Sequence, residues 1–203
     1  HSGNAWKLAT MIADRFISLA EAVGVVYVEF PEWGRWGHTL QLNLSDIYEC
    51  VEEQIGLSLA IPECFRHNKN PLNHDIIYVM TPSHAYAAWR IHALLKGHLD
   101  SCVCEIGGGY GGCAYYVCQR LLGRYAIIDL PVVNVLQGFF LVKTCGAENV
   151  HLYGEDTHER RIHVLPYWMM REMPDRCFAL TVNQESLPEI DRRNAELYIK
   201  EIA

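Results

Sequence analysis

A glycine-rich stretch in the second half of the chain is the part of the sequence best suited to binding chemistry. It follows an apolar run that ends at Ile106, and its glycines are Gly107, Gly108, Gly109, Gly111 and Gly112. Glycine is required where the backbone adopts a positive φ, or where a ligand comes against the main chain. A tight turn between a strand and a helix needs fewer glycines than this. We therefore predict a loop that binds a ligand along its backbone, with an ordinary strand-to-helix turn as the alternative.

The spacing of these glycines fits two kinds of nucleotide-binding loop. Gly107, Gly109 and Gly112 satisfy G-x-G-x-x-G, whereas Gly107, Gly109 and Gly111 satisfy G-x-G-x-G. The first form alone indicates a dinucleotide such as NAD. Glu105 changes the balance, because a carboxylate just before the loop sits badly against a pyrophosphate. It suits a ligand with an ammonium group and no phosphate, such as S-adenosylmethionine (SAM), although a salt-bridge or helix-dipole role for Glu105 remains open.

Asp129 and Leu130 follow the next apolar run along the chain, Tyr125–Ile128. A carboxylate at the tip of that predicted strand can accept hydrogen bonds from both hydroxyls of a ribose. Proteins that bind NAD and proteins that bind SAM share this feature, so it indicates a nucleoside without deciding which one. We expect Asp129 and the adjacent Leu130 to contact the cofactor. The alternative is that Asp129 is the N-cap of a helix that begins near Pro131.

Three segments of the chain together resemble one enzyme family. Glu105–Gly112, Ile127–Pro131 and Asn183–Glu189 are similar, in content and order, to motifs of the sugar O-methyltransferases, which depend on SAM. The similarity covers about residues 99–203, and the glycine motif is its most specific part. It implies a Rossmann-like methyltransferase sheet, SAM as the cofactor, and a sugar or glycoside hydroxyl as the methyl acceptor. The last strands of that family's sheet have no counterpart here, so we expect a C-terminally incomplete domain.

Residues for the chemistry are sought at the ends of the later strands. Methyl transfer to a hydroxyl needs an acceptor held in line with the methyl group, and it benefits from a general base. Glu185 is the candidate base, although an exposed loop carboxylate explains it equally well, and Asn183 is a candidate to position the acceptor or the cofactor. Ser186 and Glu189 match a capping box, which is the interpretation we prefer for that pair. Tyr167 is a candidate to stack on adenine.

Other polar and aromatic residues carry weaker signals. Carboxylates surround a histidine in Gly154–Glu159 and could hold a divalent metal, but a solvated loop explains them more simply, and we predict no metal site. Trp168 fits a core position as well as a ligand contact. His84 and His92, on a predicted helix, could reach the acceptor, but lone histidines on helices are more often surface or core residues. The loop Trp33–His38 could stack on a sugar face, or it could fill part of the core.

The elements that must position these residues follow from the periodicity of apolar side chains. Helical spacing predicts helices over residues 5–23, 46–54 and 81–97, and an extended run over 25–30, so residues 1–98 form a mostly helical region. From residue 99 onward, strands are predicted at 101–106, 125–130 and 178–182, and two extended stretches at 150–154 and 161–165. Helices are predicted at 112–122, at 132–145 and from 187. This alternation indicates an α/β fold with a parallel sheet, and residues 99–203 are the predicted SAM-binding Rossmann-like domain.

Composition excludes several classes of partner. The net charge is −7 and no basic face stands out, which argues against nucleic acid. No segment reaches the roughly 18 apolar residues of a membrane span. The eight cysteines lie in apolar runs without zinc-site spacing, which indicates reduced core thiols of a cytoplasmic protein.

Two other functions stay open. They are an NAD-dependent oxidoreductase and a non-catalytic binding module with a methyltransferase-like fold. We expect the N-terminal helices to pack beside the sheet domain, because half-apolar helices need a partner surface. There they would cover the cofactor crevice or bring copies of the chain together as a homo-oligomer.

Overall fold

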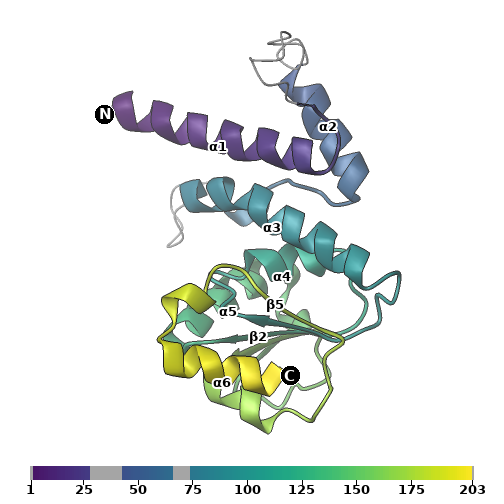
Figure 1. Ribbon diagram of the computed structural model, residues 1–203, viewed down its shortest axis with the longest axis vertical. Coiled ribbons are helices and arrows are strands. Elements are labelled where there is room, and N and C mark those ends of the chain that lie inside the picture. Colours follow the sequence, from purple (N-terminus) through teal and green to yellow (C-terminus); the bar gives the residue numbers. More distant parts are fainter. Residues whose placement is uncertain (1, 28–42, 66–73, 203) are drawn as a thin grey trace. The chain divides into compact units, whose positions relative to one another are not determined.

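The chain consists of two compact units. The computed structural model describes residues 2–27, 43–65 and 74–202. The first unit covers residues 1–89 and the second covers residues 90–203. Helices make up the described part of the first unit, and the second contains a sheet (Figure 1). The loop Trp33–His38 and the second half of the extended run predicted at 25–30, residues 28–30, lie outside the described residues.

The N-terminal region is helical, as its periodicity predicts. Its helices are α1 (Ser2–Ala22), α2 (Leu44–Ile55) and α3 (His74–Leu94), and the boundary between the two units falls within α3. The N-cap of α2 is Asn43, whose side chain accepts a hydrogen bond from the backbone of Ser45. Pro82, which the pattern predicts in the first turn of a helix, lies inside α3, where proline removes one backbone donor. The buried residues Ile77 and Ala85 on either side are consistent with a helix that continues through it.

The C-terminal unit is built on a five-stranded sheet in the order β3-β4-β2-β1-β5. The strands are β1 (Val103–Ile106), β2 (Tyr125–Asp129), β3 (Val150–Leu152), β4 (Ile162–Pro166) and β5 (Leu180–Asn183). Every neighbouring pair is parallel. The predicted α/β fold with a parallel, Rossmann-like sheet is therefore confirmed, together with a mostly helical N-terminal region.

Helices cover both faces of this sheet. They are α4 (Gly112–Val117), α5 (Pro131–Cys145) and α6 (Arg192–Ile202), with short 3-10 segments at Tyr167–Glu172 and Leu187–Glu189. Figure 1 shows α4 and α5 on one side of the sheet and α6 on the other. Side chains alternate along a strand. Cys104 and Ile106 accordingly join the cluster that contains Met170 and packs against Tyr198 of α6. Glu105, between them, points to the opposite face, which α4 and α5 cover.

Two helices of the C-terminal unit differ from their predicted bounds. The helix that begins at Gly112 ends at Val117 instead of Leu122, because the chain turns back toward Leu99. The carbonyl oxygen of Leu99 accepts hydrogen bonds from the backbone of both Leu122 and Gly123, at 2.6 and 2.9 Å. The helix predicted from Leu187 is one 3-10 turn, and α6 begins later, where Asp191 accepts hydrogen bonds from the next residues' backbone N–H groups.

None of the eight cysteines forms a disulfide within the part of the chain that the structure describes. Cys50 and Cys64 are exposed, so the prediction that every thiol belongs to the core is wrong for these two. Among the residues that the structure describes, no helix is both long enough and apolar enough to cross a membrane.

Candidate functional site

The candidate site lies at the carboxyl ends of β1, β2 and β5. The strands β2, β4 and β3 lie on one side of β1. The chain then returns and places β5 on the other side of β1. In open α/β sheets, ligands bind outside the carboxyl ends of the strands at such a reversal of strand order. The glycine loop follows β1, Asp129 ends β2, and Asn183 ends β5. The topology therefore brings the predicted site residues to one edge of the sheet.

The glycines of the loop meet two different requirements. Gly107, Gly109 and Gly111 have positive φ values of 73°, 55° and 94°, a conformation that favours glycine. A side chain at Gly107 would overlap Ser186, and one at Gly108 would come within 2.7 Å of Ile127 Cγ2. Among the described residues other than its two chain neighbours, no atom lies within 4 Å of the position of a Cβ at Gly109. The loop is thus closely packed underneath and open at Gly109, where a ligand can approach the backbone.

Glu105 lies under the loop and is buried, with a relative exposure of 1%. The hydroxyl of Tyr125 donates a hydrogen bond to its Oε2 atom at 3.0 Å. A Cβ on Gly108 would be 3.0 Å from the same oxygen, so the carboxyl group lies directly beneath that residue. Burial raises the pKa of Glu105 to about 7. The hydrogen bond from Tyr125 lowers this pKa, and the negative charge of Asp129 raises it by a smaller amount. A ligand contact by Glu105 stays a prediction.

Two hydrogen bonds hold the carboxyl group of Asp129, and the backbone of the glycine loop lies nearby. Its Oδ1 accepts from the backbone N–H of Leu130 at 2.8 Å, and its Oδ2 accepts from Nε2 of Gln137 at 2.7 Å. Burial raises the pKa of Asp129, and hydrogen bonds from Leu130, Gln137 and the backbone of Gly108 and Gly109 oppose that rise. The N-cap of α5 is Leu130, without a side-chain capping bond, so the alternative that Asp129 caps this helix is wrong.

The tip of β5 is locked onto the end of β1. Nδ2 of Asn183 donates to the carbonyl oxygen of Ile106 at 2.8 Å and also to the hydroxyl of Ser186. That hydroxyl donates to the same carbonyl at 3.0 Å, and Oδ1 of Asn183 accepts from the backbone of Leu187 at 3.3 Å. Ser186 makes no capping bond, so the capping-box interpretation is wrong. The side chains of Asn183 and Ser186 therefore lie at the start of the glycine loop, where Ser186 packs against Gly107.

Glu185 lies between these two residues, and its side chain is exposed. Its φ value is 64°, in the left-handed region that residues with a Cβ rarely adopt. Strained backbone of this kind occurs often at functional sites. The structure thus places Glu185 at the same sheet edge as the glycine loop, and its role as a base stays a prediction.

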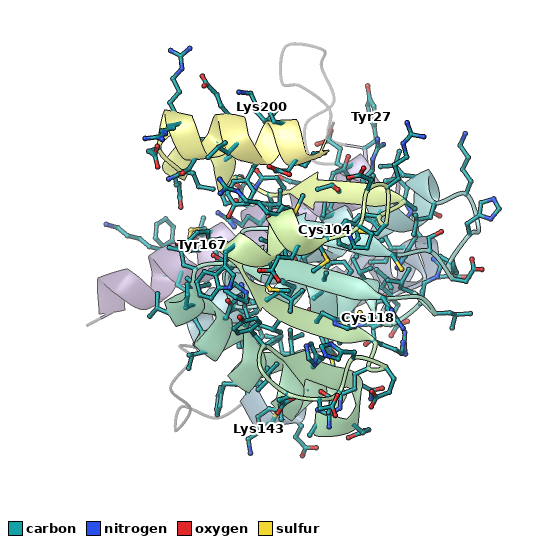
Figure 2. All side chains as sticks on the ribbon, turned by 90° about the horizontal axis from the view of Figure 1, so that it is seen from below. Tyr27, Cys104, Cys118, Lys143, Tyr167 and Lys200 are labelled. Atoms are coloured by element: carbon teal, nitrogen blue, oxygen red, sulfur yellow. The ribbon has the colours of Figure 1, made fainter. Side chains whose placement is uncertain are left out.

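Aromatic side chains lie at the carboxyl end of β4. Tyr167 follows Pro166, which pairs with Asp129 of the neighbouring strand. The ring of Trp168 is 5.1 Å from that of Tyr167 and 5.8 Å from that of Tyr153, in edge-to-face contacts. Figure 2 labels Tyr167 and Cys118 toward opposite ends of the sheet. Tyr167 is 48% exposed and Trp168 37%, so both rings can meet a ligand, and the core position considered for Trp168 is not observed.

The remaining candidates have other structural partners. Glu155 accepts hydrogen bonds from the backbone of Leu152 and from Thr157, and it forms a 3.2 Å ion pair with Arg160. Within the described ranges, no group of three or more His, Cys, Asp or Glu side chains has a metal-binding arrangement.

The two helical histidines are both buried. Nε2 of His92 bonds to the carbonyl oxygen of Val117, at the end of α4, with a distance of 2.9 Å. His92 therefore lies away from the glycine loop, and its interpretation as a core residue fits better than a contact with the acceptor. His84 belongs to the N-terminal unit.

One residue of the site was missed from the sequence. Gln137 is fully buried on α5 and bonds directly to Asp129. The available signal was its chemistry, because Asn134 and Gln137 are the polar residues in the otherwise apolar run Val132–Phe140. Their spacing of three places them on one face of a helix.

Comparisons with known proteins give a weak similarity to one solved structure. No family model matches the chain, and no curated protein matches it. Among solved structures, the chain is similar to the mitomycin 7-O-methyltransferase MmcR, with 18% sequence identity and a TM-score of 0.45. The alignment covers 75% of this chain and 41% of that enzyme, so this chain spans less than half of the enzyme's length. A similarity of this degree carries no argument about activity, which rests on the residues of the site.

Proposed function

We propose that the chain is the SAM-binding part of a SAM-dependent O-methyltransferase. The observation that carries this proposal is the position of the Asp129 carboxyl group beside the glycine loop, at the reversal of strand order. The backbone of Gly108 and Gly109 lies close enough to this carboxyl group to lower its pKa, and a negative charge beside these glycines opposes the binding of a pyrophosphate there. A nucleoside without phosphate therefore fits better than a dinucleotide.

The residues at the sheet edge fit SAM group by group. Asp129 can accept further hydrogen bonds from the ribose hydroxyls, since Leu130 and Gln137 use one position on each oxygen and a carboxylate offers about four acceptor positions. Leu130 and the exposed ring of Tyr167 would contact adenine. The open backbone at Gly109 would receive the amino-acid part of the cofactor, with Gly107 and Gly111 shaping the turn. Glu105 would supply negative potential beneath the loop to a cationic ligand, and Asn183 would fix the crevice wall.

The chemistry at this edge needs one further group from the chain. Bound SAM supplies a methyl group on a sulfonium centre. Transfer of that methyl group to a hydroxyl, with loss of the methyl–sulfur bond, would require the hydroxyl proton to leave the acceptor oxygen. Glu185 is exposed at the tip of β5 and would accept this proton. A sugar or glycoside as acceptor is supported by the family resemblance and by the exposed rings of Tyr153 and Trp168 at the same edge.

Titration calorimetry with candidate cofactors tests which of them the chain binds. We expect SAM and S-adenosylhomocysteine to bind the chain and NAD to give no heat of binding. Binding of NAD without SAM would replace the proposal with an oxidoreductase. SAM binding without methyl transfer from labelled SAM to any member of a sugar and glycoside panel would favour a non-catalytic binding module. These measurements also decide between the functions that the sequence leaves open.

A further inference from the structure

Gln137 and Asn134 form a directed hydrogen-bond chain that ends on Asp129. Nδ2 of Asn134 donates to Oε1 of Gln137 at 2.9 Å, and Nε2 of Gln137 donates to Oδ2 of Asp129 at 2.7 Å. The first bond occupies the amide oxygen of Gln137, so its NH₂ group must face the carboxyl group. The chain therefore fixes which way the Gln137 amide points and where the second oxygen of Asp129 lies.

Burying these two amide side chains is energetically unfavourable, which indicates that they do more than fill space in the core. Gln137 has a relative exposure of 0%, and a buried amide is unfavourable unless it is hydrogen-bonded. Oδ1 of Asn134 is buried without a hydrogen-bond partner in the described structure. An apolar pair at these two positions would continue the apolar run of α5 without either requirement. The polar pair is explained if the orientation and charge of Asp129 matter.

We propose that Gln137 is the positioning residue of this site, which holds Asp129 ionised and aimed for a ribose, with Asn134 orienting Gln137 in turn. The inference rests on the proposed function, because it assigns the recognition of the ribose to Asp129. It adds that this recognition depends on a residue of α5 that does not itself touch the ligand. The backbone bond from Leu130 fixes Oδ1, and Gln137 fixes Oδ2.

The charged and titratable groups around Asp129 determine which substitution of Gln137 is informative. Glu105 on β1 and Tyr198 on α6 both interact electrostatically with it, whereas Gln137 on α5 is neutral. Replacing the amide by a carboxyl group in Gln137→Glu keeps the shape but puts a second acid on Oδ2. Two such acids share one proton, and they repel each other once that proton is lost.

The experiment measures SAM affinity by calorimetry at pH 6, 7.5 and 9 for the wild type, Gln137→Met and Gln137→Glu. Val135→Ala is the matched control, because Val135 lies on the same helix and is 74% exposed. We expect Gln137→Met to bind SAM about tenfold more weakly, the scale of one hydrogen bond to a charged group. Gln137→Glu should approach the wild type at pH 6 and fall progressively behind it toward pH 9.

The outcomes separate this inference from the proposed function. Wild-type affinity in both Gln137 variants, with weak binding in Asp129→Ala, would overturn the positioning role and leave the SAM site intact. A loss in Gln137→Glu that is equal at pH 6 and pH 9 would also overturn it, since damaged packing has no such pH dependence. If Gln137→Met does not fold, the pH profile of Gln137→Glu decides. A wild-type chain that does not bind SAM would refute the proposed function and this inference together.

Discussion

The hydroxyl of Tyr125, at the start of β2, donates a 3.0 Å hydrogen bond to Oε2 of Glu105, in the middle of β1. Both residues are buried, and Tyr125 and Val103 are partners in the register that joins the two strands. The bond crosses the face of the sheet that α4 covers, beneath Gly108. The charge of this carboxyl group therefore affects both the stability of the sheet and the electrostatic potential at the loop above it. Its titration can be measured from the free energy of unfolding and from ligand affinity.

The first prediction concerns stability and pH. The pKa of Glu105 is raised from 4.5 to about 7 in the folded chain, so the unfolded chain loses this proton first as pH rises. The stabilisation that the protonated Glu105 side chain gives to the folded state is therefore fully present below pH 4.5. It is lost as pH rises to about 7. We expect Glu105→Gln to gain free energy of unfolding relative to the wild type between pH 4.5 and 8, by roughly 3 kcal/mol.

Urea unfolding of both proteins at several pH values measures this difference. Glu189→Gln serves as the control, because Glu189 is an exposed carboxylate on a 3-10 turn of the same unit. A difference between Glu105→Gln and the wild type that stays constant with pH would show that Glu105 titrates as an ordinary carboxylate.

The second prediction concerns protons released on binding. A cation above the loop favours the ionised form of Glu105, whose pKa lies at about 7 in the free protein. Near pH 7 SAM binding should release up to about half a proton from this group, and SAM affinity should increase as pH rises from 6 to 8. Calorimetry in buffers of different ionisation enthalpy counts the released protons. Glu105→Gln should abolish the release, and an unchanged release in that variant would assign the proton to another group.

The third prediction concerns Asp129. We expect Asp129→Ala to weaken SAM binding by about 1–3 kcal/mol, the scale for a lost hydrogen-bond partner. The apo protein should also melt at a lower temperature, because the buried amide of Gln137 then has no acceptor. Lower melting therefore does not identify the ligand contact, and a ribose-specific measurement is needed.

Comparison of S-adenosylhomocysteine with its 2′-deoxy analogue provides that measurement. The wild type should prefer the ligand with the complete ribose, and Asp129→Ala should lose most of this preference. An equal preference in both proteins would remove Asp129 from the ribose site.

The fourth prediction separates catalysis from strain at Glu185. As a general base, Glu185 should contribute about 10²–10⁴-fold to methyl transfer, so Glu185→Gln should lower kcat while SAM affinity stays unchanged. Transfer of labelled methyl groups at saturating SAM, together with calorimetry, measures both quantities. Glu189→Gln, on the 3-10 turn Leu187–Glu189 that follows, is the matched control and should leave kcat unchanged.

Glu185→Gly tests the strain itself. Glycine adopts the φ of 64° without a Cβ clash, so we expect this variant to be more stable by up to about 1 kcal/mol and to be catalytically impaired. Thermal unfolding and methyl transfer, measured on the same preparation, give both values. A variant that is more stable and fully active would exclude Glu185 as the base.

Much of the fold follows from local patterns. The apolar runs that end at Ile106 and Ile128 predict β1 and β2 to within a few residues, because a buried parallel strand is mostly apolar along its length. The position of Pro82 inside α3 was not predictable, since local propensity favours proline in a first turn and burial of the helix outweighs it. The early end of α4 depends on bonds to Leu99, from an earlier part of the chain.

The order of residues along the chain is enough to place a glycine loop after one strand and Asp129 at the end of the next, because each is a short-range pattern within a single stretch. Folding in three dimensions was needed to bring Ser186 against Gly107, Glu105 beneath the loop, and Gln137 to Asp129. These contacts join residues on different elements. Periodicity fixes which face of its own element a side chain occupies, whereas strand order and register decide which other side chain it meets there.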